Sequence, residues 1–482
     1  MIIKLVLRQL KAKPGRAILL LFGYGVGAGV MMVLLAVGHA MLEQSRDLSL
    51  VGGGEITVLP EGVDLEALRT GASGGFSLGI DRARFITRQL LGGPRESGQI
   101  QAVSPQLTLK LLYLTHGDRT VTVRAAGEIP SRAAAAGTAA TVLEGNWRDT
   151  PRDSLWITPT TDQLYNELDR WHYPTLRDST WAEWQYFNIK ISESEWWYLT
   201  FMVTGQLPDG SWNGRLLATH RRPDGTHRAY LETFAPGEVE LDTLSATVKM
   251  GAGGVSFDSG SWLLSGQARD RSGESLTFQL QVVPEPHRWF PPVELESQGF
   301  LSGYVVPALR ASGSGKICLA GHCRTIEGAA AYHDHNWGVW RGVSWEWGIA
   351  QGHDIDLLYG GVSRDVADQA GSAPFFLAIA DRMGVAQVLR FDQVSYRGGK
   401  AVLAVPGAYA PDSLTILAAR GNDTLRVAVA VKSVNATPIN AAGWRRAFLQ
   451  MRGWFTVTGK VAGREVSDSG GGFFETWREL VP

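Results

Sequence analysis

The chain lacks an excess of charge of either sign. Its 482 residues include 46 Lys and Arg against 47 Asp and Glu, so the formal net charge is −1. No run of basic residues occurs beyond position 16. A nucleic-acid partner is therefore not expected, because binding to a phosphate backbone needs a basic surface.

Cysteine is also scarce, and Cys318 and Cys323 are the only two cysteines. Without a second cysteine pair, a metal site built on cysteine is disfavoured.

Charged side chains are absent from residues 17–42. About 20 apolar residues suffice for a helix to cross a bilayer, so this stretch predicts one transmembrane helix. Five basic residues precede it, Lys4, Arg8, Lys11, Lys13 and Arg16. Three acidic residues and one basic residue follow it, Glu43, Arg46, Asp47 and Glu55. This asymmetry predicts a single-pass protein of the bacterial inner membrane, with residues 1–16 in the cytoplasm and the bulk in the periplasm. A signal peptide cut near Gly38-His39-Ala40 is the alternative, but its apolar core would exceed the usual length of about 7–15 residues.

Glycines recur at four-residue spacing within this span. Gly23 pairs with Gly27, and Gly25 pairs with Gly29. Small residues at this spacing let a second helix approach closely in lipid. A partner helix and a lone helix that tolerates glycine are both compatible with the pattern.

The segment before the span, Leu7 to Arg16, resembles the start of the permeases of lipoprotein- and macrolide-exporting ABC transporters. The resemblance implies a periplasmic core domain after the helix, and ATPase and permease subunits as partners. Residues 43–160 fit a small α/β domain of that kind, with strands expected at 55–59, 107–113 and 121–123 and a helix at 81–91. No catalytic constellation occurs in it. The later permease helices are missing, so this chain cannot form half of a transport channel by itself.

Aromatic density rises after residues 150–180, where turn signals mark a domain boundary. All 17 Trp residues follow position 146. Strand-like runs bounded by turns then recur, at 196–203, 215–219, 262–268 and 276–283. Helical patterns are scarce, so this region is predicted to be all-β, a sandwich or a barrel.

The most unusual stretch is Ala331 to Gly338, AYHDHNWG, followed by Trp345-Glu346-Trp347-Gly348. In a strand, His333, His335 and Trp337 share one face, and Tyr332, Asp334 and Asn336 share the other. The run is too polar for an ordinary core strand and too aromatic for an ordinary loop. It therefore predicts the wall of a ligand pocket.

Three ordered motifs carry a second resemblance. They are Glu195-Trp196-Trp197-Tyr198, the central stretch 332–338 and Gly471-Gly472-Phe473-Phe474-Glu475-Thr476. Together they resemble the lipocalin-like AttH and hydroxyneurosporene synthase (carotenoid 1,2-hydratase) family over about residues 170–482. The resemblance implies a mainly β fold with two lipocalin-like β-barrel halves, 170–305 and 306–482. It also implies long apolar ligands such as isoprenoids, and no cofactor.

Adding water to an isolated double bond needs a proton donor, a π-face that stabilises a carbocation, and a delivered water. By the resemblance, His335 and Trp337 match the paired active residues of the hydratases, and Tyr359 matches a tyrosine on a following strand. The hydratases carry an aspartate two residues after that tyrosine, whereas this chain has Gly361. Asp334, Asp354 or Asp356 could substitute. The absence of an aspartate at position 361 favours a binding protein over a hydratase.

The remaining candidate ligand-binding residues each have a plainer explanation. They are Glu195, Trp197, His333, Trp345, Trp347 and Glu475. The aromatic residues can be barrel core, and the two acids can be buried partners of an arginine or the backbone. An acid held in an apolar cavity would instead gain a raised pKa useful for proton transfer. For His333 and His335 the alternatives are a hydrogen-bond network with Asp334 and Asn336, or a metal site completed by His353 or His322.

The two cysteines are separated by four residues, and a four-residue hairpin loop would place them opposite each other on paired strands. An oxidising periplasm favours a disulfide between them.

The sequence leaves three candidate functions. The first is a membrane-anchored periplasmic protein that binds a lipid or isoprenoid and serves an ABC exporter. The second is a hydratase or cyclase acting on an isoprenoid alkene. The third is a structural module that recognises a partner protein and has a filled core.

Overall fold

The computed structural model describes residues 12–45, 56–59, 80–95, 97–117, 119–137, 148–153, 156, 159–172, 180–205, 213–297, 300–340, 343–364, 375–402, 405–441 and 444–480. The chain divides into two compact units. Unit 1 comprises Met1–Gly79 and Gln101–Thr150, and unit 2 comprises Ile80–Ile100 and Pro151–Pro482. The predicted helix at 81–91 is present as α5 (Ile80–Gly92), but it belongs to unit 2 and not to the predicted 43–160 domain.

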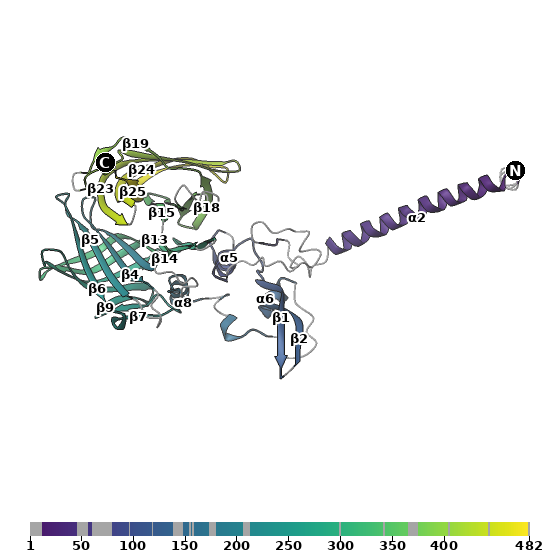
Figure 1. Ribbon diagram of the computed structural model, residues 1–482, viewed down its shortest axis with the longest axis horizontal. Coiled ribbons are helices and arrows are strands. Elements are labelled where there is room, and N and C mark those ends of the chain that lie inside the picture. Colours follow the sequence, from purple (N-terminus) through teal and green to yellow (C-terminus); the bar gives the residue numbers. More distant parts are fainter. Residues whose placement is uncertain are drawn as a thin grey trace. The chain divides into compact units, whose positions relative to one another are not determined.

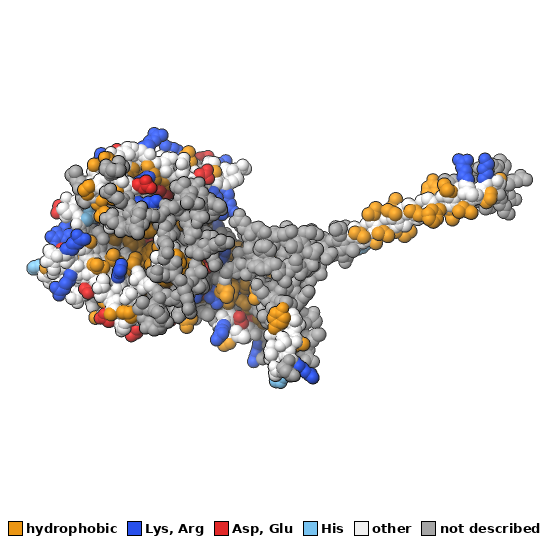
Figure 2. Space-filling model, in the orientation of Figure 1, with side chains coloured by type: hydrophobic (Ala, Val, Ile, Leu, Met, Phe, Trp, Pro, Cys, Tyr) orange, Lys and Arg blue, Asp and Glu red, His pale blue; other side chains and the backbone are white. Residues whose placement is uncertain are grey.

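Unit 1 begins with the long helix α2 (Pro14–Ser45). Its part Pro14–His39 has a mean hydropathy of 2.3 and is long enough to cross a membrane. Apolar side chains run along most of this helix (Figure 2). A membrane anchor and a signal sequence share these properties. The predicted apolar helix is therefore present, whereas its membrane and its topology remain predictions.

The rest of unit 1 contains the antiparallel hairpin of β1 (Gln106–His116) and β2 (Arg119–Glu128), followed by α6 (Pro130–Ala135). The strands expected at 107–113 and 121–123 are thus confirmed. The strand expected at 55–59 is wrong for residues 56–59, which have no regular structure and no described strand as a partner, and Glu55 lies outside the described residues.

In unit 2, the first of two barrels is closed by eight described strands in the order β11-β13-β14-β3-β4-β5-β6-β10, with β10 pairing back to β11 (Figure 1). Their bounds are β3 (Trp181–Lys190), β4 (Trp196–Thr204), β5 (Asn213–Arg221), β6 (His227–Phe234), β10 (Ser261–Arg269), β11 (Ser275–Pro284), β13 (Phe300–Leu319) and β14 (His322–Val339). Shorter strands extend this sheet, namely β7 (Val239–Leu241), β8 (Val248–Met250), β9 (Gly253–Asp258) and β12 (Phe290–Ser297). The single-turn helices η1 (Pro151–Asp153) and η2 (Pro236–Glu238) also belong to unit 2.

The second barrel has the order β18-β17-β16-β15-β25-β24-β23-β22, and β22 pairs back to β18. Its strands are β15 (Val343–Gly352), β16 (Asp356–Arg364), β17 (Phe375–Asp381), β18 (Gly384–Phe391), β22 (Ser413–Arg420), β23 (Asp423–Ala441), β24 (Trp444–Val461) and β25 (Arg464–Glu479). Beside it lie β19 (Ser395–Arg397), β20 (Lys400–Ala401) and β21 (Tyr409–Ala410). The predicted mainly β fold with two barrel-like halves is therefore confirmed.

Alternating sequence explains why these runs become barrel strands. In β11 the side chains of Leu276, Phe278, Leu280 and Val282 are buried, and the residues between them are exposed. Such a period of two directs one face of a strand to the core and the other to solvent. Burying each large apolar side chain contributes about 1.5–3 kcal/mol, so the pattern fixes which face turns inward.

The change from one barrel to the other does not fall at the predicted boundary. Residues 305 and 306 both lie inside β13, which pairs with β14 in the first sheet. The change of sheet comes between β14 and β15, that is, between Val339 and Val343. At the tip of the β13–β14 hairpin, Cys318 and Cys323 form a disulfide. The turn there contains two residues, Ala320 and Gly321, both with positive φ, as a tight hairpin turn requires.

Between the barrels lies a third buried cluster, which we call the seam. It includes Tyr186, Tyr198 and Tyr332 from the first barrel and Trp347 and Phe473 from the second. One acid of β16 in the second barrel forms ion pairs with two arginines of the first barrel's part of the chain. Asp356 Oδ2 is 2.7 Å from Arg288 Nη1, and Asp356 Oδ1 is 2.6 Å from Arg310 Nη2.

Candidate functional site

Strand β14 turns its two faces toward different surroundings, as the sequence alternation predicts. His333, His335 and Trp337 lie inside the first barrel and are fully buried. Tyr332 and Asp334 are also buried, but they face the seam. The same strand therefore contributes to two separate polar clusters.

The interior cluster is built from β14, β3 and the segment after helix α8 (Thr161–Leu168). A capping box at Thr160 and Gln163 fixes the start of α8, and Tyr165 and Leu168 bury its inner face. The chain leaving α8 carries Asp169 and His172 into the barrel. The register places Gln185 opposite His335, so that both side chains point inward.

Hydrogen bonds satisfy most of this interior cluster. Asp169 accepts from His335 Nδ1 at 2.9 Å, from Gln185 Nε2 at 2.8 Å and from Trp262 Nε1 at 2.8 Å. Glu183 Oε1 lies 2.9 Å from His335 Nε2 and 2.9 Å from His172 Nδ1. Both ring nitrogens of His335 are thus placed against carboxylates.

These pairings set the charge state of the interior. Burial alone would raise the pKa of Asp169, but His333 and His335 together lower it below the usual value. Burial would likewise raise the pKa of Glu183, and His172 and His335 lower it. For His335 burial acts to lower the pKa, but hydrogen bonds to Asp169 and Glu183 raise it to about 9. The cluster therefore holds carboxylates around an imidazolium at neutral pH.

Side chains of the chain itself fill the space beside these rings. Phe187 stacks on His333 with a centroid separation of 3.9 Å, and His172 stacks on Trp337 at 3.7 Å. Gly303 makes room for Trp337, because a Cβ at Gly303 would lie 2.1 Å from the indole. The pocket wall at His333, His335 and Trp337 therefore stays a prediction. In the structure these side chains are buried among other rings, and the two histidines contact carboxylates.

Tyr359 lies elsewhere, inside the second barrel. Its ring is 6.1 Å from those of Phe391 and Phe474, and Gly348 leaves space for it. The predicted grouping of Tyr359 with His335 and Trp337 is not assembled, because adjacent barrels enclose them separately. Of the substitute acids, Asp356 is held by two arginines and Asp354 is largely exposed.

Glu195 and Trp197 have structural partners. Glu195 Oε2 is 2.7 Å from Arg324 Nη1, and Glu195 Oε1 is 3.2 Å from His220 Nε2. Trp197 stacks on His220 at 4.0 Å. This arrangement matches the plainer explanation, a buried acid paired with an arginine. The other two histidines considered as metal ligands, His322 and His353, are exposed.

The remaining predicted residues, Asp334, Trp345, Trp347 and Glu475, meet at the seam. Trp345 Nε1 donates to Glu475 Oε2 at 3.2 Å, and Gln450 Nε2 donates to Glu475 Oε1 at 3.2 Å. Trp347 Nε1 donates to the Tyr332 hydroxyl at 3.1 Å. Asp334 accepts from Asn336 Nδ2 at 2.6 Å.

Aromatic rings surround Trp345 at this end of the seam. The indole of Trp345 is 4.9 Å from Trp477, 5.3 Å from Phe448 and 5.5 Å from Trp340. Trp184 lies 4.7 Å from Trp340. We call these five residues, Trp184, Trp340, Trp345, Phe448 and Trp477, the aromatic rim. All five are half-buried, and so is Glu475, so solvent reaches the group.

Both acids of the seam have raised pKa values, and Glu475 has the opposite charge state to the acids of the barrel interior. An apolar environment, and then the nearby charge of Asp334, raise the pKa of Glu475 to about 8. Burial raises the pKa of Asp334 to about 6, although hydrogen bonds from Tyr332 and Asn336 act against the shift. The donors to Glu475 are neutral, so nothing in its hydrogen bonding favours ionisation strongly. Glu475 is therefore a protonated carboxyl at neutral pH.

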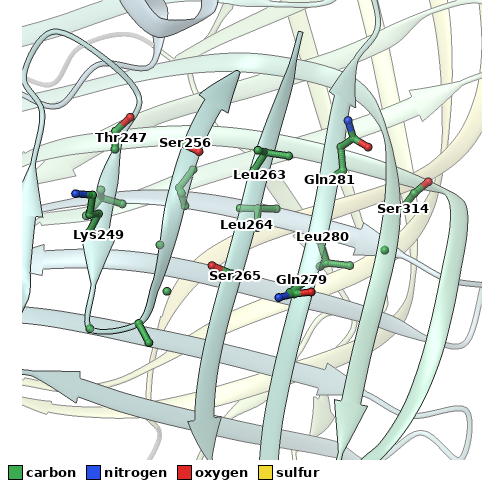
Figure 3. A pocket seen from close by; sticks show the side chains of 17 residues that line it. Thr247, Lys249, Ser256, Leu263, Leu264, Ser265, Gln279, Leu280, Gln281 and Ser314 are labelled. Carbon is green, nitrogen blue, oxygen red and sulfur yellow. The ribbon is translucent and has the colours of Figure 1, made fainter. Parts of the chain in front are cut away.

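A further hollow of about 650 Å³ lies over β8, β9, β10, β11 and β13 (Figure 3). Ser256, Gln279, Gln281 and Ser314 are among the side chains that line it. Its lining contains no carboxylate, imidazole or aromatic ring. None of the predicted site residues lies there.

Sequence reasoning missed Asp169, His172, Glu183 and Gln185, and also most of the aromatic rim. Within the predicted all-β region the expected strands begin at residue 196, so they do not include β3. Its sequence alternates, and Glu183 and Gln185 stand two residues apart as His333 and His335 do. The same spacing of two links Glu475 to Trp477 on one face of β25.

No family model matches the sequence, and no curated protein matches it. Several solved structures do. One is a candidate AttH protein, NE1406, from Nitrosomonas europaea, which is 16% identical with a TM-score of 0.44, covering 65% of this chain and 98% of the other. Another is CghA bound to Sch210972, 14% identical with a TM-score of 0.42, covering 66% and 97%. A third is kievitone hydratase from Nectria haematococca, 11% identical with a TM-score of 0.40, covering 65% and 98%.

One of these proteins is named as a candidate AttH protein, but TM-scores of 0.40–0.44 carry no argument for the family of the present chain. Identities of this size say nothing about the ligand or the activity of the present chain. The resemblance of the first residues to exporter permeases has no counterpart among these matches.

Proposed function

We propose that this chain binds a hydrophobic molecule, of the lipid or isoprenoid class, at the aromatic rim, with Glu475 as its polar contact. The observation that carries the proposal is a half-buried carboxyl, with a pKa of about 8, beside five half-buried aromatic rings. A protonated carboxyl donates a hydrogen bond and carries no charge. It therefore suits a hydroxyl or carbonyl group on an otherwise apolar ligand.

The aromatic rim supplies the apolar contact. Indole rings bury large areas and are rigid, so they bind apolar ligands at a small cost in conformational entropy. Binding sites usually combine such a lining with a few polar groups that fix orientation. The seam has both, whereas the interior of the first barrel is packed with ion-paired side chains.

Native mass spectrometry of the full chain, purified from its own membranes in detergent, tests this proposal. We expect a co-purified hydrophobic molecule in the wild type and a strong loss of it in Trp345→Ala. Trp454→Ala is the matched control, because Trp454 is an exposed indole of the same barrel, on β24. Wild-type protein free of hydrophobic molecules, or equal recovery from Trp345→Ala, would contradict the proposal.

A second function is favoured by one observation, the raised pKa of Glu475 within contact of an indole. In a hydratase or cyclase acting on an isoprenoid alkene, the Glu475 carboxyl would donate its proton to an alkene carbon. The rings would stabilise the resulting carbocation through their π-faces. Water would then add to the cation, and its proton would return to the Glu475 carboxylate.

Incubation with isoprenoid alkenes in D₂O separates the two functions. An enzyme would give a deuterated product, and Glu475→Gln would abolish turnover while retaining the bound ligand. A binding protein would leave the alkene unchanged in both forms.

We also propose that the face of α2 that carries Gly25 and Gly29 contacts the permease of an ABC exporter. This proposal is in line with the resemblance of residues 7–16. The full chain should then retrieve an ATPase and a permease in a pull-down, and the double change Gly25→Leu and Gly29→Leu should lose them. The change Val26→Leu and Val30→Leu serves as the control on another face of the same helix. Unchanged recovery after the glycine changes would refute the helix contact.

A further inference from the structure

The interior of the first barrel contains three ligand-type atoms that converge. His172, His335 and Glu183 each offer one ligand atom, and these three atoms all lie within 4.8 Å of one another. Two come from neighbouring strands, β3 and β14, and the third comes from the segment after α8. Among the described residues, no other group of three or more His, Cys, Asp or Glu side chains has this spacing.

A second observation points to a missing ligand. Both histidines direct their nitrogens at Glu183 Oε1, while Glu183 Oε2 is buried and has no hydrogen-bond partner among the described residues. The Glu183 side chain is fully buried. An unsatisfied carboxylate oxygen at such a position is costly, because it gives up its hydration without gaining a partner.

The surroundings of His335 are those of a metal-binding histidine. Its other nitrogen, Nδ1, is 2.9 Å from Asp169 Oδ1. A carboxylate in that place fixes the ring orientation and makes the opposite nitrogen a better ligand. Asp169 is itself fixed by Gln185 and Trp262, so the orientation is rigid.

We propose that His172, His335 and Glu183 bind a divalent transition-metal ion of the zinc type, with Asp169 as the positioning residue. Two imidazoles and a carboxylate suit zinc and similar ions, whereas magnesium and calcium prefer oxygen ligands alone. The ion would replace the protons that the two histidines direct at Glu183. A carboxylate that binds through both oxygens would also satisfy Oε2.

Access to this site is from the side of His172. The His172 side chain is 12% exposed, while those of Glu183 and His335 are not exposed at all. An ion held there would tie the segment after α8 to strands β3 and β14. It would therefore act on the stability of the first barrel, at a distance from the acids of the seam.

Zinc content of the full chain, purified in detergent without a polyhistidine tag, tests the proposal. After removal of metal with a chelator and equilibrium dialysis against Zn²⁺, we expect about one zinc per chain. His172→Ala should bind at least about tenfold more weakly, because a ligand is lost. Cobalt should give the visible absorption of a low-coordinate site in the wild type and not in this variant.

A matched control is His220→Ala. His220 is a buried histidine of the same barrel that also contacts a glutamate, Glu195, but no second histidine joins that pair. Its zinc content should equal that of the wild type. Glu183→Gln keeps the side-chain volume, and it should also lose zinc if His172→Ala fails to fold. Wild-type protein that retains no zinc, or equal binding by Glu183→Gln and the wild type, would overturn the proposal.

Discussion

The acids on the two sides of β14 have pKa values shifted in opposite directions. Toward the barrel interior, Asp169 and Glu183 are fully buried yet have lowered pKa values, because histidines contact both. Toward the seam, Asp334 and Glu475 have pKa values raised to about 6 and about 8. Burial acts in the same direction on all four acids, so the difference comes from the partners that each acid meets.

This difference separates a structural cluster from a candidate site. Paired ions make a rigid core, but they are poor donors at neutral pH. A protonated acid among neutral donors and aromatic rings can still bind a polar group or transfer a proton. We therefore assign binding of the hydrophobic ligand to the seam, although the unusual histidine pair, with its proposed metal site, lies on the other face.

Loss of the carboxylate in Asp169→Ala should have the largest effect. His335, Gln185 and Trp262 would each lose a buried partner, and breaking a buried pair of this kind costs about 3–5 kcal/mol. Denaturant unfolding followed by tryptophan fluorescence measures the change. Asp392→Ala, at an exposed position, should stay within about 0.5 kcal/mol of the wild type. Equal stabilities of the two variants would show that the interior cluster does not stabilise the barrel.

The next effect is the pH dependence of ligand binding at the seam. Glu475 is protonated below pH about 8, so affinity for a hydrophobic ligand should fall as the pH rises through that value. We expect a loss of about tenfold or more, because an ionised carboxylate disfavours an apolar neighbour. The same titration affects the free energy of unfolding. The pKa of Glu475 in the folded protein lies above the usual 4.5, so Glu475 stabilises the folded protein below pH about 4.5. This stabilisation is lost as the pH rises through about 8.

Glu475→Gln should make binding independent of pH over this range, since an amide does not titrate. Fluorescence quenching of tryptophan by a bound lipid analogue, followed from pH about 6 to about 10, would measure both forms. The same pH dependence in both forms would assign the titration to another group.

The smallest effect should come from Asp334→Asn. The charge of Asp334 helps raise the pKa of Glu475, so removing it should move the midpoint of the binding titration to lower pH. We expect a shift of about one pH unit or less, worth about 1.4 kcal/mol or less. Asp354→Asn is the control, because that side chain is 83% exposed. A midpoint that rises, or that moves equally in the control, would be inconsistent with coupling between the two acids.

The sequence predicts much of the fold because alternation and charge are local signals. The apolar helix, the strands near 196–203, 215–219, 262–268 and 276–283, and the two faces of β14 could all be inferred from spacing. The spacing of the two cysteines likewise predicts the hairpin whose tip carries them.

The site was harder to predict, because its residues meet only after both barrels have closed. Asp169 reaches His335 across a sequence separation of 166 residues, and Trp345 reaches Glu475 across 130. The alternation of side chains along a strand predicts that His335 points to the same side as His333. It does not predict whether a ligand or acids of the chain itself contact that side chain. The outward face of β14 carries Asp334, whose charge acts on Glu475.

The most direct test of the central contrast is infrared spectroscopy of the carboxyl groups across pH in the wild type, Glu475→Gln and Glu183→Gln. We predict that the difference between the wild type and Glu475→Gln contains a protonated carboxyl band at neutral pH that disappears near pH 8. The difference between the wild type and Glu183→Gln should contain only an ionised carboxylate at that pH. A protonated Glu183, or a Glu475 that is already ionised at neutral pH, would contradict the assignment of the seam as the functional site.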